Sequence, residues 1–332
     1  RPGNRERNLM ELPYASYVAV GILAISYALI ISNRVQRSTA ALLGALLMVI
    51  TGIVSETDVL GHVQWEVIAL IFGMFVIVDS LRHAGFFDLM VHYVERLSKG
   101  KPLQLFLLFS ALSALLAAFM DSVTVLIFMA SLTITACKKF GLNPIPFIIG
   151  EILSANCGGA ATMVGDPPNV IIGTALGYSF IDVVRIMAPV AIVAFIVNLV
   201  LMRYLFRKEL QGPREVMPRS TAPHEDVKDW RLLWISLCIF AFTITLLVLH
   251  STLNITISMV GISGACLVLL LGGPKTEDVV QQIDWRTLLF FVGLFVIVGG
   301  VESTGVLAVL GDSIGAVGGG NLMLTLTILL WT

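Results

Sequence analysis

Residues 146–177 read PFIIGEILSANCGGAATMVGDPPNVIIGTALG, two apolar stretches separated by glycines and by the run Gly165-Asp166-Pro167-Pro168-Asn169. Pro168 lacks a backbone donor, and the glycines tolerate unusual backbone angles. We therefore expect two half-helices around an unwound turn. Backbone that is broken at membrane depth persists only where protein or a water-filled cavity satisfies it. The stretch thus predicts a broken membrane helix whose interruption lies inside the protein.

The composition places this broken helix in a bilayer. Of 332 residues, 57% are hydrophobic and 13% are charged, and the mean hydropathy is +0.92. A soluble chain of this size could not bury so many apolar side chains. The composition excludes soluble enzymes, nucleic-acid binders and disordered scaffolds, and a net charge of −1 gives no sign of a DNA partner. The lipid bilayer is the expected partner, and we expect no nucleic acid.

A second apolar stretch, 103–137, is interrupted at Phe119-Met120-Asp121-Ser122-Val123-Thr124. One helix over its whole length would overshoot a hydrocarbon core of about 30 Å. A re-entrant hairpin with its polar tip at mid-membrane resolves this mismatch. Uninterrupted spans are expected at 14–32, 37–54, 65–81, 187–206, 231–250, 255–272 and 286–301.

The basic residues set the orientation of these spans. With the 208–230 linker in the cytoplasm and the hairpin re-entrant, all 21 lysines and arginines face the cytoplasm except Arg1, Arg5, Arg7 and Arg185. The positive-inside rule supports this layout. It does not decide whether 103–137 re-enters or crosses twice, because both leave the later spans in the same direction.

The chain also repeats itself at an offset of 220 residues. Trp65, Gly73 and Gly85 match Trp285, Gly293 and Gly305, and the run Phe75-Val76-Ile77-Val78 recurs at 295–298. Five crossings precede the second copy, so that copy enters from the opposite side. Inverted repeats of this kind are typical of secondary transporters, which bind substrate near the midplane at broken helices.

These observations predict an all-α polytopic membrane protein, an inverted-repeat secondary transporter whose second repeat is truncated. The copies of the hairpin tip and the broken helix would lie beyond residue 332, in about 95 further residues. The expected parts are an N-terminal extramembrane segment 1–13, a first repeat 14–207, a cytoplasmic linker 208–230 and an incomplete second repeat 231–332. The first repeat would hold scaffold helices 14–100, the hairpin 103–137, the broken helix 146–177 and a helix 187–207.

The hairpin tip is the first candidate site. An ionised Asp121 at the bilayer centre costs at least about 2.5–3.5 kcal/mol, so a cation, a proton or a partner must offset it. Ser122 and Thr124 would supply hydroxyl oxygens to such a cation. The alternative is an aspartate that caps the second hairpin helix. The two roles are compatible.

The broken helix is the second candidate site. Unwound carbonyls bind cations, and half-helix N-termini present amides. Glu151, about one turn before Asn156, is either a proton relay or a structural or interface-facing carboxylate. The candidate residues of this segment are Asn156, Gly158, Gly159, Thr162, Gly165, Asp166 and Asn169. The alternative is a plain helix break with Asp166 as its cap.

Three stretches resemble a known family. GGAATMVGDPPNVII (158–172), AAFMDSVTVLIFM (117–129) and VQWEVIALIFGMF (63–75) are similar to segments of the ion transporter superfamily. The similar branch holds ArsB-type arsenite permeases, NhaD-type sodium/proton antiporters and the melanosomal P protein, with a citrate-transporter-like domain. Ser122 stands where that family usually has asparagine.

The resemblance implies inverted repeats, elevator-type movement and a homodimer, and it leaves room for an ATPase partner subunit. By position it assigns the same ion-binding residues, Asp121, Ser122, Thr124, Asn156, Gly158, Gly159, Thr162, Gly165, Asp166 and Asn169. No cofactor is expected, and no metal beyond a transported sodium ion. The coupling ion would be H⁺ or Na⁺, and the partner a small inorganic solute or ion.

The expected function is therefore transport across the plasma membrane rather than enzymatic catalysis. Two carboxylates facing a dicarboxylate would repel it in a medium of low dielectric. Asp121 and Asp166 thus favour a cation, a proton or a neutral solute such as arsenite, which is largely an uncharged trihydroxide at neutral pH. The leading hypothesis is a proton-coupled arsenite/antimonite-type efflux permease. The alternatives are an NhaD-type sodium/proton antiporter and a sodium-coupled di/tricarboxylate transporter.

Overall fold

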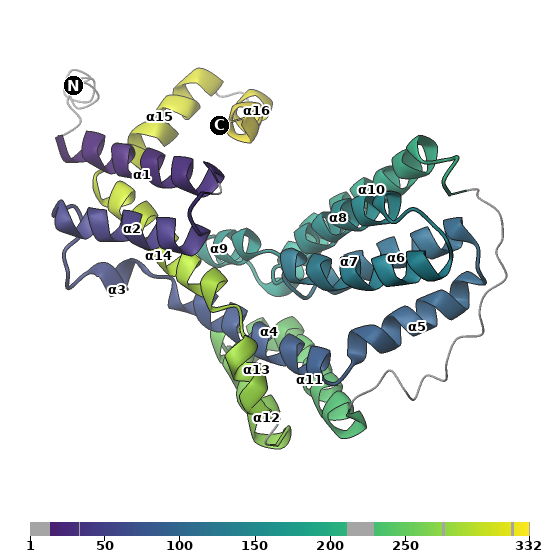
Figure 1. Cartoon of the computed structure of the whole chain (residues 1–332). Helices are drawn as coiled ribbons and strands as arrows, with labels where there is room; N and C mark the ends of the chain where they lie inside the picture. Colours follow the sequence, from purple (N-terminus) through teal and green to yellow (C-terminus); the bar gives the residue numbers. More distant parts are fainter. Residues whose placement is uncertain (1–13, 33, 211–228, 274–275, 320–321, 332) are drawn as a thin grey trace. The chain divides into compact units, whose positions relative to one another are not determined.

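The computed structural model describes residues 14–32, 34–210, 229–273, 276–319 and 322–331 (Figure 1). The described residues form sixteen helices and no strand. They divide into two compact units, one of residues 1–68 and 284–332 and the other of residues 69–283. The fold is all-α, as the sequence predicts. The N-terminal segment 1–13 and most of the linker, 211–228, lie outside the described residues.

The first unit combines both ends of the chain. Its helices are α1 (Tyr14–Ser32), α2 (Arg37–Ile50), α3 (Val59–His62), α14 (Trp285–Ser303), α15 (Val306–Gly318) and α16 (Leu322–Trp331). Helix α14 packs along α2, and α1 lies against both.

The second unit begins inside α4 (Trp65–His83) and holds the two interrupted stretches. Its other helices are α5 (Phe86–Ser98), α6 (Pro102–Ala117), α7 (Ser122–Lys139), α8 (Ile145–Ala160), α9 (Pro167–Ala175), α10 (Phe180–Leu205), α11 (Trp230–Leu253), α12 (Ile257–Leu271) and α13 (Thr276–Gln282). The predicted hairpin becomes α6 and α7, separated by 118–121. The predicted broken helix becomes α8 and α9, separated by 161–166.

The offset of 220 residues relates the bounds of the helices. Helices α4 and α5 recur as α14 and α15 with identical limits, and the first residue of α2 recurs as that of α12. Gly85 and Gly305 precede α5 and α15 with φ of 90° and 79°, left-handed values that glycine adopts readily. The same local geometry therefore occurs twice, whereas the inverted relation of the two copies stays a prediction.

The packing of α4 and α14 repeats as well. A Cβ added to Gly73 of α4 would overlap the backbone of Gly261 in α12. A Cβ added to Gly293 of α14 would overlap the backbone of Ala41 in α2. At the offset of 220 residues, Gly293 corresponds to Gly73, and Gly261 corresponds to Ala41. Each matched glycine thus lets its helix approach a helix of the other copy.

Helices α6, α7, α8 and α10 pack together as a bundle around a buried aromatic core. The rings of Phe106 and Phe147 meet edge to face at 6.0 Å, and both are buried together with Phe109. Added Cβ atoms on Gly150 and Gly158 of α8 would overlap Phe106 and the Ala114 backbone of α6. Small residues thus let α8 lie directly on α6, which positions the breaks of the two stretches beside each other.

Helix α10 differs from the prediction, which began it at 187. It begins at Phe180, because Ser179 and Asp182 form a reciprocal capping box: the Ser179 hydroxyl accepts from Asp182 N, and the Asp182 side chain accepts from Ser179 N. Pro189 lies within the helix without ending it. The charges of Asp182 and Arg185 lower the local hydropathy and hide this helix start from a hydropathy reading.

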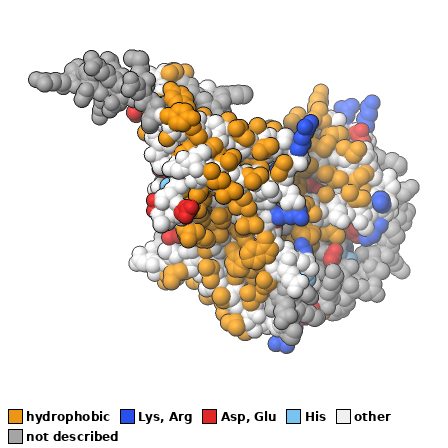
Figure 2. Space-filling model, turned by 60° about the vertical axis from the view of Figure 1, so that its left-hand side comes forward, with side chains coloured by type: hydrophobic (Ala, Val, Ile, Leu, Met, Phe, Trp, Pro, Cys, Tyr) orange, Lys and Arg blue, Asp and Glu red, His pale blue; other side chains and the backbone are white. Residues whose placement is uncertain are grey.

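The membrane character of the chain is visible on its surface. Five described helices, α1, α7, α10, α11 and α14, are long and apolar enough to cross a bilayer, and six if α4 and α5, bent by 62°, count as one span. Hydrophobic side chains cover broad areas of the face shown in Figure 2. On α10, Val190, Val193 and Val197 are 59–66% exposed. Such an apolar surface is suited to contact with the lipid tails of a bilayer.

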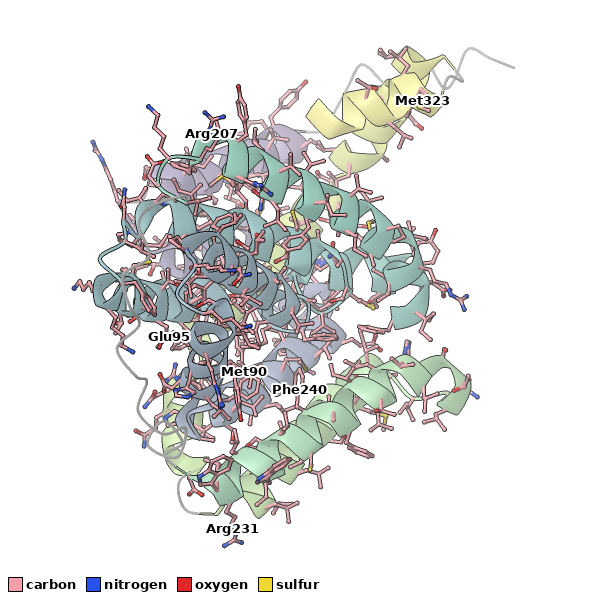
Figure 3. The ribbon with its side chains drawn as sticks, turned by 90° about the vertical axis from the view of Figure 1, so that its right-hand side faces the viewer. Met90, Glu95, Arg207, Arg231, Phe240 and Met323 are labelled. Atoms are coloured by element: carbon pink, nitrogen blue, oxygen red, sulfur yellow. The ribbon has the colours of Figure 1, made fainter. Side chains whose placement is uncertain are left out.

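Two further contacts hold α5 in the second unit. Met90 of α5 and Phe240 of α11, labelled in Figure 3, pack against a buried cluster around Leu81, Leu89 and Leu233. Glu95 of α5, 5% exposed, accepts hydrogen bonds from Lys139 Nζ of α7 at 3.3 and 3.4 Å. Helix α5, which lies within the expected scaffold 14–100, is an amphipathic helix of 13 residues.

Candidate functional site

The hairpin tip begins α7 with an aspartate cap. Asp121 Oδ2 accepts hydrogen bonds from Thr124 N at 2.9 Å and from Thr124 Oγ1 at 3.1 Å. This is the capping role that the sequence offers for Asp121, since aspartate satisfies a free amide of the first helical turn. Because Asp121 and Thr124 are only partly buried, they also border the cavity described below.

The broken helix is tied to the tip by Thr162, which is 6% exposed. Its hydroxyl donates to the Ala118 carbonyl at the end of α6. The same oxygen accepts from Val164 N at 3.3 Å and from Gly165 N at 3.1 Å. A single side chain therefore satisfies backbone groups of both interruptions.

Asn169 closes the unwound segment from the α9 side. Its Nδ2 donates to the Gly159 carbonyl at 3.2 Å and to the Thr162 carbonyl at 2.9 Å. These carbonyls belong to the end of α8 and the turn after it, which have no partner within their own helix. The side chain thus replaces the hydrogen bonds that the helix break removes.

Asp166 links the two stretches directly. Ser122 Oγ, at the first residue of α7, donates to Asp166 Oδ1 at 2.8 Å. Asp166 precedes α9, yet its side chain makes no capping hydrogen bond to that helix. Its carboxylate lies against Gly159, where any Cβ would overlap it. The alternative of Asp166 as a plain cap therefore does not describe this geometry, in which the carboxylate points toward the hairpin tip.

The N-terminus of α9 is a poor site for an anion. Its first two residues are Pro167 and Pro168, which carry no N–H. The next amide, Asn169 N, already donates to the Asp166 carbonyl at 3.0 Å. At α7, the Thr124 amide is taken by Asp121. Both half-helices thus present carboxylates at the ends where an anion site would need free amides.

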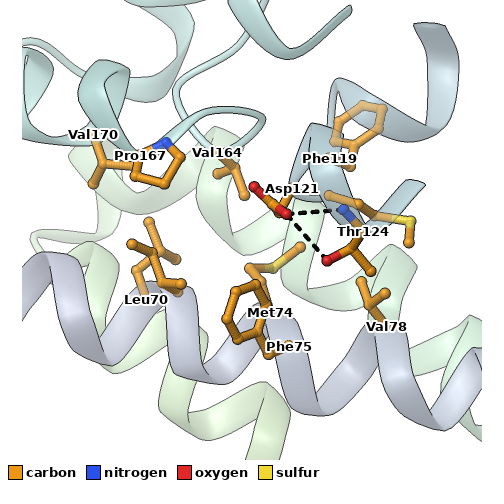
Figure 4. A pocket seen from close by; sticks show the side chains of 12 residues that line it. Leu70, Met74, Phe75, Val78, Phe119, Asp121, Thr124, Val164, Pro167 and Val170 are labelled. Atoms are coloured by element: carbon orange, nitrogen blue, oxygen red, sulfur yellow. Dashed lines mark hydrogen bonds between the residues drawn. The ribbon is translucent and has the colours of Figure 1, made fainter. Parts of the chain in front are cut away.

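A small cavity lies between the two interruptions and α4 (Figure 4). It offers about 20 Å³, room for one water-sized occupant. Asp121 and Thr124 face it from the tip, and it is otherwise lined by Leu70, Ile71, Met74, Phe75, Val78, Phe119, Met120, Val164, Pro167 and Val170. Among the described residues that line it, Asp121 is the single charged one and none is basic.

The structure brings most of the predicted site residues together. Asp121, Ser122, Thr124, Thr162, Asp166 and Asn169 are joined by the hydrogen bonds above, and Gly158, Gly159 and Gly165 permit the close backbone approach. Asn156 is different, because it is exposed on α8 and makes none of these contacts. Glu151 lies deeper in the bundle, buried and bonded to Thr133 of α7.

The wall contributed by α4 was missed as part of the site. Leu70, Met74, Phe75 and Val78 line the cavity opposite the tip. The sequence marks this stretch by its recurrence and its family resemblance, but apolar side chains carry no signal of binding by themselves. Only the spatial position of α4 beside the two breaks identifies them.

Two broken helical stretches that meet at a buried polar site, in an all-helical apolar chain, define a membrane transporter rather than an enzyme. The citrate transporter (CitMHS) family matches residues 27–332, and the chain belongs to this family.

Individual relatives agree with this assignment. An uncharacterized transporter of Mycobacterium tuberculosis is 35% identical over 320 residues, which cover 95% of this chain and 75% of that protein. Magnetosome protein MamN of Magnetospirillum gryphiswaldense is 29% identical over 304 residues, or 88% of this chain and 68% of its own. P protein of Mus musculus is 28% identical over an alignment of 358 residues, which covers 84% of this chain and 43% of that protein. The predicted membership of the ion transporter superfamily is confirmed, and the chain is a multi-pass transporter of the cell membrane.

Proposed function

We propose that the protein is an ion-coupled secondary transporter in which Asp121 and Asp166 hold the coupling cation or proton. The observation that carries this proposal is the pairing of the two interruptions. One carboxylate lies at each break, each is bonded to a hydroxyl, and the described residues that line the adjoining cavity include no basic side chain. Such carboxylates need a cation or a proton to offset their cost in a low dielectric.

The cargo that suits this site is uncharged or cationic. The described residues that line the cavity include no arginine, lysine or histidine, so a di- or tricarboxylate there would be repelled by the Asp121 carboxylate. The prolines that open α9 also remove the amides that recognise anions at a helix N-terminus. Arsenite and antimonite, as uncharged trihydroxides, would hydrogen-bond to carboxylate and hydroxyl oxygens. Proton-coupled efflux of such a solute is the function proposed first.

Sodium/proton antiport is the second candidate. The side-chain ligands at the breaks are hard oxygen donors, namely the Asp121 and Asp166 carboxylates and the Ser122 and Thr124 hydroxyls. Unwound carbonyls and carboxylates are the groups that hold Na⁺ in transporters with discontinuous helices. In this case sodium would itself be the cargo and would exchange with protons at the same carboxylates. The family's description as citrate transporters makes citrate the third arm of the test.

The test is a flux panel in proteoliposomes containing the full-length protein. Arsenite, antimonite, sodium, citrate and succinate are each followed with and without a pH gradient, and the carboxylates also with and without a sodium gradient. Arsenite or antimonite flux that responds to the pH gradient is the expected result. Citrate flux without any arsenite, antimonite or sodium response would overturn the proposed cargo.

The assignment of the carboxylates has its own variants. Asp121→Asn and Asp166→Asn should each reduce coupled flux about 10- to 100-fold, the equivalent of the 1.5–3 kcal/mol of a hydrogen bond to a charged group. Asp312→Asn, an exposed carboxylate of α15, is the matched control and should transport like the unmodified protein. If both site variants keep full flux, the coupling site lies elsewhere.

A further inference from the structure

Another carboxylate lies inside the bundle of α6, α7, α8 and α10, apart from the hairpin tip. Glu151 of α8 is 0% exposed, and its Oε1 accepts a hydrogen bond from Thr133 of α7, also 0% exposed. Its other oxygen, Oε2, is buried without a hydrogen-bond partner in the part of the chain that the structure describes. Glu151 precedes Gly158 by seven residues, about 10 Å along α8. The Asp166 carboxylate lies against Gly159, one residue further along α8, so Glu151 does not share one ion with it.

Three further polar side chains lie at about the same level of the bundle as this glutamate. Ser110 Oγ of α6 lies beside Gly150, where an added Cβ would be 3.3 Å from it. Ser154, one turn after Glu151 on the same face of α8, accepts a hydrogen bond from Asn198 Nδ2 of α10 at 3.0 Å. Four helices thus contribute buried polar groups to one level of the bundle.

Several atoms of these groups have no hydrogen-bond partner among the residues that the structure describes. Besides Glu151 Oε2, the buried atoms without a partner among the described residues include Ser110 Oγ, Ser113 Oγ and Asn198 Oδ1. Buried polar groups are nearly always hydrogen-bonded, so these unpaired atoms are available to share a bound proton. A carboxylic O–H at Oε2 would convert that oxygen into a donor, for which serine hydroxyls and an amide oxygen are suitable acceptors.

Within the described part of the chain, no basic side chain forms an ion pair with Glu151. Helix α6 carries no titratable residue, and on α10 Arg185 and Arg203 are exposed near the two ends. On α7 the nearest titratable group is Cys137, a thiol, while Lys139 is engaged with Glu95. Ion pairs among the described residues do not include Glu151. An ionised carboxylate in this surrounding would be costly, and binding a proton removes that cost.

We propose that Glu151, with Thr133, Ser110, Ser154 and Asn198 at about the same level of the bundle, forms a proton site separate from the Asp121–Asp166 site and carries the coupling proton of the transport cycle. This rests on the proposed function and narrows it, because the coupling proton is assigned to Glu151 and only the cargo or a metal cation to Asp121 and Asp166. The cargo and any metal cation stay at the tip, where the other carboxylates lie. Proton binding and cargo binding are then performed by different groups of the same bundle.

The first arm of the test reads the proton without any transport. Infrared difference spectra of the purified protein between acid and alkaline pH should contain a C=O band of a protonated carboxyl that is absent from Glu151→Gln. Glutamine keeps the size of the side chain and imitates its neutral form, so the variant should fold. The matched control is Glu95→Gln, which removes another buried carboxyl and should leave that band in place. A band that persists unchanged in Glu151→Gln overturns the proton site.

The second arm reads coupling in proteoliposomes. Glu151→Gln should exchange cargo at equal pH within about twofold of the unmodified protein, while net flux driven by a pH gradient falls about tenfold or more. Net flux that follows the gradient normally, or an equal loss of exchange and net flux, overturns the coupling role. Failure of the proposed function is separate, since it would appear as absent flux in the unmodified protein while the infrared arm still reports the proton on Glu151.

Discussion

At the scale of single residues, the hydroxyl of Thr162 connects the two interruptions by hydrogen bonds. It reaches the Ala118 carbonyl of the hairpin and holds two amides of the broken stretch. Each partner is a backbone group left open by a helix break. Without the hydroxyl, three backbone groups would have to find other partners inside the protein, where unpaired groups are costly.

Replacing Thr162 tests this connection. Thr162→Val keeps the shape of the side chain but removes its hydroxyl, so we expect the free energy of unfolding to fall by about 1–3 kcal/mol and flux to fall with it. Thr162→Ser keeps the hydroxyl and should retain most of both. Thermal unfolding in detergent and flux in vesicles measure the two effects. Equal behaviour of the valine and serine variants would remove the hydroxyl from the explanation.

Some of these residue roles were readable from the sequence and others were not. Asp121 and Asp166 stand out as charges within apolar runs, and Pro167 and Pro168 mark the break beside them. The hydrogen bond from Ser122 to Asp166 and the burial of Thr133 against Glu151 depend on how separate helices are rotated about their axes. No pattern within one helix encodes that rotation.

At the scale of elements, close helix packing depends on matched glycines. Gly73 faces the Gly261 backbone and Gly293 faces the Ala41 backbone, so neither position has room for a methyl group. The two contacts occupy corresponding places in the two copies of the repeat. They therefore provide a pair of substitutions with the same expected effect.

Gly73→Ala and Gly293→Ala should each lower the free energy of unfolding by about 1–3 kcal/mol, because backbone atoms cannot move aside as a flexible side chain would. Gly21→Ala is the control, since an added Cβ on that helical glycine meets nothing within 4 Å. It should leave stability unchanged or slightly raised. Thermal unfolding of the purified variants gives the comparison, and an unaffected Gly73→Ala would contradict the tight packing of α4 on α12.

Hydropathy predicts some helix ends correctly and misses others, and the difference has a physical cause. Helix α1 has the limits expected from hydropathy, whereas α10 begins seven residues earlier than expected. Hydropathy detects the apolar middle of a span, but the capping box of Ser179 and Asp182 fixes the start of α10 with polar groups. Helix α5 was not recognised as a helix of its own because only one of its faces is buried.

At the scale of the whole molecule, the predicted orientation rests on the distribution of basic residues. Single cysteines in a background without the four native ones can test it with a membrane-impermeant thiol reagent. Lys99→Cys and Arg231→Cys should react from the cytoplasmic side, and Glu56→Cys and Tyr178→Cys from the outside. All four positions are exposed, so access depends on the side of the membrane. Reaction of Glu56→Cys and Lys99→Cys from the same side would refute the layout.

The glycine contacts also bear on the order in which the nascent chain can assemble. Helix α4 leaves the ribosome about 190 residues before Gly261, a delay of roughly 10–40 s at ordinary rates of synthesis. Helices α6 to α10 follow one another along the chain, so each can pack against its neighbours soon after it is synthesised. We therefore expect the bundle of α6, α7, α8 and α10 to assemble first. The face of α4 that carries Gly73 stays in the translocon or in lipid until α12 has been synthesised.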